Sequence, residues 1–144
     1  MKLPPSREGK PIGAFLPGVP GSDEVPTDVR AKRIYEAVES GDGYRVLVDH
    51  VWPRGVSRER ALLDAWARDL APSDELREWF DHEPERFAAF RARYRDELAA
   101  QVDRLAELRQ RAASRRVTIL YAASDEDHNN GVVLAELLRE DVRS

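Results

Sequence analysis

Two short segments hold most of the side chains that are suited to chemistry. "VDHVWPRG" at residues 48–55 joins an acid, an aromatic ring and an arginine, and "SDEDHNN" at residues 124–130 joins acids, a histidine and two amides. An arginine fork fits the oxygens of phosphate or carboxylate, and a histidine titrates near neutral pH. These residue types predict the binding of a small anion, with acid–base chemistry as an open extension.

Arg54 is the predicted anion clamp, and His128 is the candidate general acid or base. Asp49 either orients a partner or acts as the base. The other predicted ligand contacts are aromatic, amide or imidazole side chains in these segments and in "WFDHEPERF": Trp52, Asn129, Asn130 and His82. Structural alternatives stand beside these roles, namely core packing for Trp52, and pairing with a helix end or with Asp49 for Arg54.

Metal and covalent chemistry find no support in the sequence. The chain has no cysteine, and its three histidines fall in separate segments without a helical H-x-x-x-H spacing. We therefore predict no metal site. Walker, G-x-G-x-x-G and G-x-S-x-G motifs are also missing, so neither a phosphate-binding glycine loop nor a nucleophile elbow is indicated. The sequence leaves the cofactor unknown.

Three apolar stretches predict the strands that would position the two segments. They span residues 29–37, with Ile34 and Tyr35 at the centre, then 44–52 and 117–124. A long helical crossover between the second and third strands makes them parallel. The carboxyl ends of parallel strands meet at one edge of a sheet, where ligands bind in open α/β folds. The topology therefore predicts that "VDHVWPRG" and "SDEDHNN" share one pocket.

The helices follow from apolar spacing and capping residues. Ser57 is placed to cap a short turn, and Leu63, Trp66 and Leu70 then recur at helical spacing, while Ser73 is a suitable N-cap for "DELREWF". A single helix is predicted from Pro84 onward, about 35–40 Å long. Its apolar stripe is Phe87, Phe90, Tyr94, Leu98, Val102, Leu105 and Leu108.

The last helix is expected to carry part of the candidate site. Asp127 is its expected N-cap. His128 and Asn129 would then lie in its first turn, where free backbone N–H groups bind anions.

Composition limits the class of protein. The 144 residues carry a net charge of −4 and 35% charged side chains, with no signal peptide or membrane span recognisable. We predict one α/β domain over residues 29–144, with a small, mostly parallel sheet flanked by helices. A Pro- and Gly-rich extension precedes it at 1–28. A cytoplasmic protein is expected.

Two other functions remain open. Only Lys2, Lys10 and Lys32 are lysines among the 23 basic residues. The arginines of the long helix would suit a nucleic-acid-binding or regulatory module: Arg86, Arg93, Arg104 and Arg111. The negative net charge argues against that alternative. A scaffold or oligomerisation domain that uses residues 1–28 as an arm is the third possibility, and the oligomeric state is left open.

The motifs in combination resemble one family. The sequence contains D-x-x-W-P-R-G, L-A-P-S, W-F-x-H-x-P-E-R-F, Y-A-A and H-N-N, and over residues 30–139 it is similar to the domain-of-unknown-function 488 family, in its YeaO-like branch. The resemblance implies a small α/β domain and no assigned activity. Its motif positions here are Asp49, Trp52, Pro53, Arg54, Gly55, His82, His128, Asn129 and Asn130. Two departures are His50, where the family leads us to expect arginine, and the long N-terminal extension.

Overall fold

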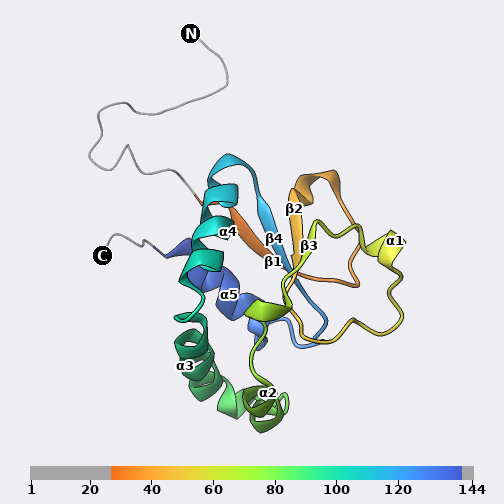
Figure 1. The fold of residues 1–144 in the computed structure, drawn as a ribbon. Coiled ribbons are helices and arrows are strands. Elements are labelled where there is room, and N and C mark those ends of the chain that lie inside the picture. The colour runs from red at the N-terminus through yellow and green to blue at the C-terminus, as the bar shows by residue number, and fades with distance from the viewer. Residues whose placement is uncertain (1–26, 141–144) are drawn as a thin grey trace, which may run out of the picture.

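The computed structural model describes residues 27–140, which form an α/β domain around a four-stranded sheet (Figure 1). Every strand pair is parallel, and the strand order is β1-β4-β2-β3. The strands are β1 (Val29–Arg33), β2 (Tyr44–Leu47), β3 (Ala65–Trp66) and β4 (Val117–Tyr121). The α-helices are α1 (Arg58–Ala61), α2 (Asp74–Phe80), α3 (Phe87–Leu98), α4 (Val102–Ser114) and α5 (Asn130–Arg139). The predicted fold class is confirmed.

The most apolar strand lies in the interior of the sheet. All five residues of β4 are buried, and its sequence VTILY offers apolar or β-branched side chains to both faces. β4 pairs with β1 through Val29↔Val117 and with β2 through Tyr44↔Val117. The predicted parallel pairing of the second and third stretches is therefore correct.

The two faces of the sheet are covered differently. Helices α4 and α5 pack on one face, α3 packs against α5, and the three helices enclose the main apolar core (Figure 1). The other face carries a smaller cluster, in which Ile34, Leu47 and Leu120 meet Ala61 of α1. No helix within residues 27–140 combines the length and hydropathy needed to cross a membrane.

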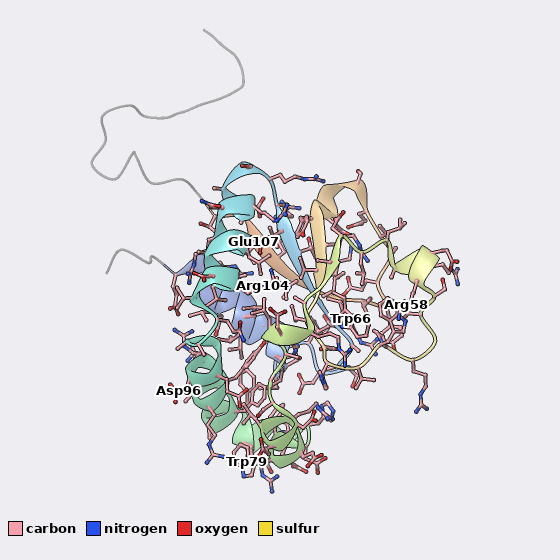
Figure 2. All side chains as sticks on the ribbon, in the orientation of Figure 1. Arg58, Trp66, Trp79, Asp96, Arg104 and Glu107 are labelled. Atoms are coloured by element: carbon pink, nitrogen blue, oxygen red, sulfur yellow. The ribbon has the colours of Figure 1, made fainter. Side chains whose placement is uncertain are left out.

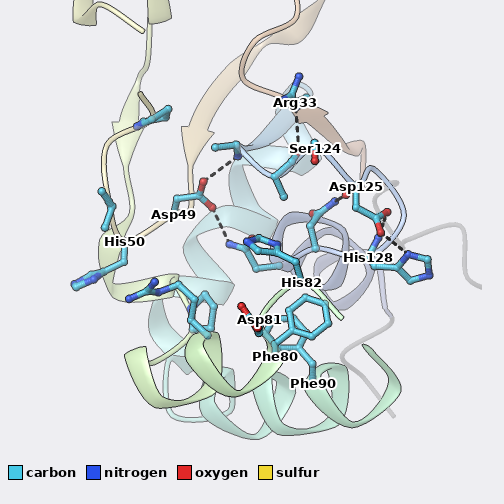
Figure 3. Close-up of a pocket in the computed structure, with 18 of the residues that line it drawn as sticks. Arg33, Asp49, His50, Phe80, Asp81, His82, Phe90, Ser124, Asp125 and His128 are labelled. Carbon is cyan, nitrogen blue, oxygen red and sulfur yellow. Dashed lines mark hydrogen bonds and ion pairs between the residues drawn. The ribbon is translucent and has the colours of Figure 1, made fainter. Parts of the chain in front are cut away.

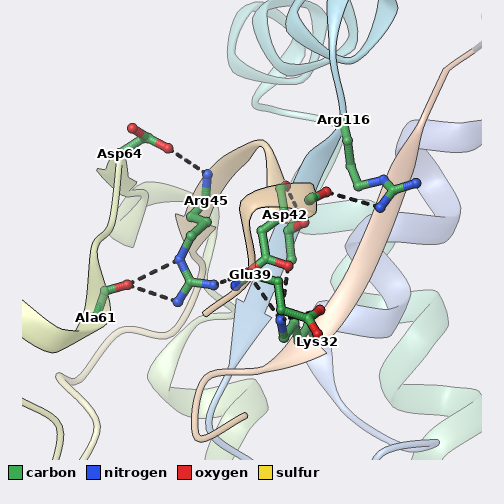
Figure 4. A network of polar contacts seen from close by, with 9 residues as sticks. Lys32, Glu39, Asp42, Arg45, Ala61, Asp64 and Arg116 are labelled. Carbon is green, nitrogen blue, oxygen red and sulfur yellow. Dashed lines mark hydrogen bonds and ion pairs between the residues drawn. The ribbon is translucent and has the colours of Figure 1, made fainter. Parts of the chain in front are cut away.

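A buried ionic network occupies the rest of that second face (Figure 4). Asp42 is held by two hydrogen bonds from Lys32 Nζ, at 2.9 and 3.1 Å, and by Arg45 Nη1. Arg45 also donates to the Ala61 carbonyl from Nε and Nη2. The cations and the acid satisfy one another in a place where an unpaired charge would be costly.

The prediction of a single long helix from Pro84 onward is wrong. α3 ends at Leu98, α4 begins at Val102, and the turn between them is closed by a hydrogen bond from Gln101 N to Leu98 O at 2.8 Å. Val102 was assigned to the apolar stripe but is 65% exposed. The break redirects the chain, because α4 packs against β4 and α5 whereas α3 packs against α2 and α5.

Two further expectations require correction. The first strand ends at Arg33 rather than residue 37, and Tyr35, expected at its centre, is 44% exposed. The helix expected over residues 63–70 is replaced by β3, which pairs with β2 through Leu47↔Trp66. Leu62 ends α1 in the left-handed conformation with φ 47°. The spacing of Leu63, Trp66 and Leu70 resembles that of a helix, yet Trp66 and Leu70 contact opposite faces of the sheet.

The predicted capping serines are confirmed. Ser57 accepts a hydrogen bond from Arg60 N at the start of α1, and Ser73 accepts one from Leu76 N at the start of α2. Of the predicted extension, residues 1–26 lie outside the described residues. Asp28, which was placed in the extension, accepts a hydrogen bond from Val117 N and therefore belongs to the sheet edge.

Candidate functional site

A cavity of about 1090 Å³ lies beyond the carboxyl ends of β1, β2 and β4 (Figure 3). Its walls come from the loops that follow these strands, from the end of α2 and from the start of α5. Both predicted segments line it. All seven residues singled out from the sequence are among the lining residues: Asp49, Trp52, Arg54, His82, His128, Asn129 and Asn130. The structure brings the set together, and the roles assigned to its members stay predictions.

Asp49 joins the strand ends at the floor of the cavity. Its Oδ2 accepts a hydrogen bond from Ala122 N at 2.9 Å, and its Oδ1 accepts one from Asn130 Nδ2 at 3.1 Å. Burial raises the pKa of Asp49 above the usual aspartate value, although these two bonds and the nearby His82 act in the opposite direction. The carboxylate therefore fastens β2, β4 and α5 to one another.

Two asparagines shape the start of α5. Asn129, and not Asp127, is the N-cap, because its Oδ1 accepts from Val132 N at 2.9 Å. His128 and Asn129 consequently precede the helix, and the expectation that they lie in its first turn is wrong. Asn130 is the first helical residue, and its Nδ2 also donates to the Val48 carbonyl at 3.0 Å. Both amides hold backbone in place beside the cavity.

His128 is oriented by an acid in its own loop. Its Nδ1 lies 2.9 Å from Asp125 Oδ2, while its ring meets the Phe87 ring edge-to-face at 5.1 Å. The other oxygen of Asp125 accepts the backbone N–H groups of Asp127 and His128. The hydrogen bond from His128 is the main cause that holds the pKa of Asp125 below its usual range. This acid–imidazole pair is the arrangement that would set the tautomer of a proton-transferring histidine.

His82 reaches the cavity from an unusual backbone turn. Asp81 and His82 are consecutive residues in the left-handed region, with φ 47° and 55°. Such conformations are uncommon for residues other than glycine and concentrate at functional sites. The turn ends α2 and directs the His82 ring toward the side of the cavity that holds Asp49 (Figure 3).

One rim of the cavity carries two arginines linked through a tyrosine. Arg33, the last residue of β1, has its guanidinium 4.6 Å from the centre of the Tyr35 ring and donates from Nε to the Ala123 carbonyl. The Tyr35 hydroxyl donates to the Arg54 carbonyl at 2.8 Å. Within residues 27–140 neither arginine forms an ion pair.

The opposite wall is the carboxyl-terminal half of α2. It presents Glu78 and Asp81, which are exposed, together with Arg77, whose Nη2 donates to Asp74 at 2.9 Å. His50 lies at the edge of this wall with Nδ1 3.4 Å from Asp74 Oδ1. His50 stands where the family resemblance led us to expect arginine, and in this chain it is attached to α2 through an acid.

Trp52 lies between the second-face cluster and the cavity. Its Nε1 donates to the Val56 carbonyl at 2.7 Å, and its ring meets the Trp66 ring edge-to-face while the Arg58 guanidinium lies 4.3 Å from its centre. Trp52 thus packs against the second-face cluster and also lines the cavity. Gly55, with φ 79°, completes the turn after Pro53.

Sequence reasoning missed Arg33, Glu78 and Asp81. Arg33 follows from the argument that identified Arg54, because it stands at the carboxyl end of a parallel strand, but the strand was extended past it to residue 37. Glu78 and Asp81 belong to a helix in another layer. Their approach to the strand ends depends on how α2 packs, which has no signal in local spacing.

The arginines of the predicted basic helix are engaged with other groups. Arg86 and Arg93 lie over the Trp79 ring, Arg104 bonds to Asp69 and Glu107, and Arg111 lies over the Tyr44 ring (Figure 2). Because α3 and α4 are separate helices, the four also lack a common axis. Within the part of the chain that the structure describes, no three histidines or acids are grouped to hold a metal ion.

Comparison with known proteins gives relatives but no assigned activity. The chain is 44% identical to the uncharacterized protein Rv3073c of Mycobacterium tuberculosis over 112 residues, which is 78% of this chain and 94% of that protein. It is 39% identical to the uncharacterized protein YeaO of Escherichia coli, again over 78% of this chain and over 97% of the relative. No solved structure matches it.

The family comparison covers the folded region almost entirely. A family model described as "Inactive DUF488-N3 subclade" matches residues 28–144, which include every strand and helix described above. The YeaO relative agrees with the resemblance seen in the motifs. The chain therefore belongs to the DUF488 family, and within it to the inactive DUF488-N3 subclade.

Proposed function

We propose that the cavity at the strand ends binds a small ligand through a phosphate or carboxylate group and does not transform it. The observation that carries this proposal is the Arg33–Tyr35–Arg54 rim. Both arginines line one large cavity, and no acid among residues 27–140 pairs with either of them. A guanidinium fork is suited to an anionic oxygen pair.

Binding without turnover fits the arrangement of the acids better than catalysis does. Both oxygens of Asp49 already accept hydrogen bonds that hold the strand ends and α5. These bonds direct the two oxygens toward the Ala122 N–H and the Asn130 amide, which are groups of the protein itself. We assign Asp49 a positioning role, and the subclade name, which includes the word inactive, supports the same choice.

The Asp125–His128 pair is the observation that favours an enzyme as the second candidate. An acid 2.9 Å from Nδ1 would hold the imidazole in one tautomer and leave Nε2 for proton transfer. In the binding proposal the doubly protonated ring instead donates from Nδ1 to Asp125 and from Nε2 to the anion. His128→Gln separates the two: it retains a donor for binding, while any turnover that depends on a titrating group is lost.

Isothermal titration calorimetry tests the proposal with inorganic phosphate, sugar phosphates and nucleotides as probes. We expect at least one probe to bind the wild-type protein, and expect Arg54→Gln and Arg33→Gln each to weaken it about tenfold or more, because a hydrogen bond to a charged group contributes about 1.5–3 kcal/mol.

Arg60→Gln is the matched control, since Arg60 is exposed on α1 and does not line the cavity. Affinity that is the same in Arg54→Gln, Arg33→Gln and the control would contradict the arginine rim. Failure of every probe to bind would contradict the anion site.

A further inference from the structure

The charges around the cavity are arranged in two groups that face each other. Arg33 and Arg54 occupy the rim formed after β1 and β2, and Glu78 and Asp81 occupy the wall formed by α2. Figure 3 shows Arg33 and Asp81 on opposite sides, with Asp49 and His82 between them. A cavity that served a simple anion would need only the first group.

The two groups do not neutralise each other. No ion pair within 4.0 Å joins Glu78 or Asp81 to any basic residue among residues 27–140. The third arginine of the lining, Arg77, is already paired with Asp74 at 2.9 Å. The α2 wall therefore presents a net negative charge to the cavity.

The backbone fixes the acidic group in place. Glu78 lies in the last turn of α2, Asp81 is the C-cap that follows it, and both line the cavity. Asp81 holds the left-handed C-cap position with φ 47°, and its N–H donates to the Arg77 carbonyl at 3.1 Å. An exposed carboxylate kept beside a large cavity by this turn is suited to accept from a cation bound there.

We infer that the ligand is a zwitterion, in which a phosphate or carboxylate contacts Arg33 and Arg54 and an ammonium group contacts Glu78 and Asp81. This inference rests on the proposed anion site and adds a second requirement to it. A simple anion would be attracted by the arginine rim and repelled by the acids of the α2 wall. A ligand with an ammonium group turns that repulsion into attraction.

Matched ligand pairs test the inference by calorimetry. Aminoalkyl phosphates of increasing chain length are compared with the alkyl phosphates of the same length, and ω-amino carboxylates with the corresponding monocarboxylates. The two arms distinguish a phosphate from a carboxylate as the anionic group. For the best chain length we expect the ammonium group to tighten binding about fivefold, as exposed ion pairs contribute up to about 1 kcal/mol.

Variants test whether the preference for amino ligands comes from the α2 wall. In Glu78→Gln/Asp81→Asn the amino and non-amino ligands should bind equally, while Arg33→Gln/Arg54→Gln should weaken both. Asparagine is compatible with the left-handed position 81. Glu75→Gln is the control, because Glu75 lies on the same helix and does not line the cavity; it should keep the fivefold preference.

The outcomes are distinguishable. Equal binding of amino and non-amino ligands to the wild-type protein overturns the zwitterion and leaves the anion site standing. A preference that persists in Glu78→Gln/Asp81→Asn overturns the assignment to the α2 wall. If neither ligand of any pair binds, the anion site and the zwitterion both fail.

Discussion

Asp42 and Asp49 are two buried or partly buried carboxylates with opposite surroundings. Burial by itself would raise the pKa of Asp42, but hydrogen bonds from Lys32, the Glu39 N–H and Arg45 outweigh it, so that the pKa lies below the usual value of 3.8. Asp49 lacks a cation in hydrogen-bonding contact, and burial raises its pKa. The Asp42 carboxylate stabilises the charged network of the sheet. The charged form of Asp49 is disfavoured by its burial beside the cavity.

The network predicts a pH-dependent stability difference for Asp42→Asn. Because the folded pKa of Asp42 lies below the unfolded one, its contribution is complete above the unfolded value and is lost as the pH falls through the folded value. We expect Asp42→Asn to lower the free energy of unfolding by about 3 kcal/mol at neutral pH, since it removes the acid that pairs with the buried Arg45. In urea titrations the difference between the two proteins should begin to shrink as the pH falls below about 4, the ordinary aspartate pKa, and should go on shrinking toward the lower folded pKa.

Asp96→Asn serves as the control at an exposed position of α3 that forms no ion pair with other described residues (Figure 2). It should follow the wild-type protein at every pH. A stability difference for Asp42→Asn that does not shrink as the pH is lowered below about 4 would contradict the ionic role of Asp42.

At the scale of elements, the break between α3 and α4 decides which helical residues contribute to the core. α3 lies against α2 and α5, and α4 lies against β4 and α5. Phe90, Tyr94 and Leu98 of α3 and Leu105 and Leu108 of α4 are buried. The break lets one apolar sequence cover two surfaces that a straight helix of the same length cannot both reach.

Val102 and Leu105 test this arrangement. We expect Leu105→Ala to lower the free energy of unfolding by about 2–4 kcal/mol, because a buried leucine is replaced by a cavity. Val102→Ala should change it by less than about 0.5 kcal/mol, since the side chain is largely exposed. Chemical denaturation of both variants measures the difference. If Val102→Ala lowered the free energy of unfolding as much as Leu105→Ala does, Val102 would be a core residue, as the prediction of one continuous helix required.

At the scale of the whole molecule, the distribution of charge bears on the nucleic-acid alternative. The net charge is −4, and the arginines proposed for that function lie over aromatic rings or bond to acids. Phosphate-driven binding needs basic side chains free to displace counterions. The observations favour the small-ligand proposal over this alternative.

A gel-shift assay with duplex DNA and with RNA checks this conclusion on the full chain. We expect no retardation at about 50 mM salt, where phosphate-driven binding should be strongest. A known basic DNA-binding protein provides the positive control. Retardation that weakens as the salt concentration is raised would contradict this conclusion and support nucleic-acid binding by the arginine-rich helices.

The two central strands, β2 and β4, and the meeting of distant segments were predictable because both depend on short patterns. VTILY and the apolar run around Val46 are buried on both faces, and parallel strands must end at one edge. The capping serines Ser57 and Ser73 likewise act on backbone groups only a few residues away. The helix break, β3 and the exposure of Tyr35 were not predictable, because each depends on which surface a segment meets after folding.

The sequence by itself determined an α/β domain with Asp49, Arg54 and His128 at one sheet edge, since strand burial and parallel order follow from local composition. Tertiary structure alone decided that Arg33 stands beside Arg54 and that the α2 acids face them. The physical reason is that helix packing directions and the left-handed turn at Asp81 and His82 arise from contacts between elements. Residue spacing along the chain carries no record of such contacts.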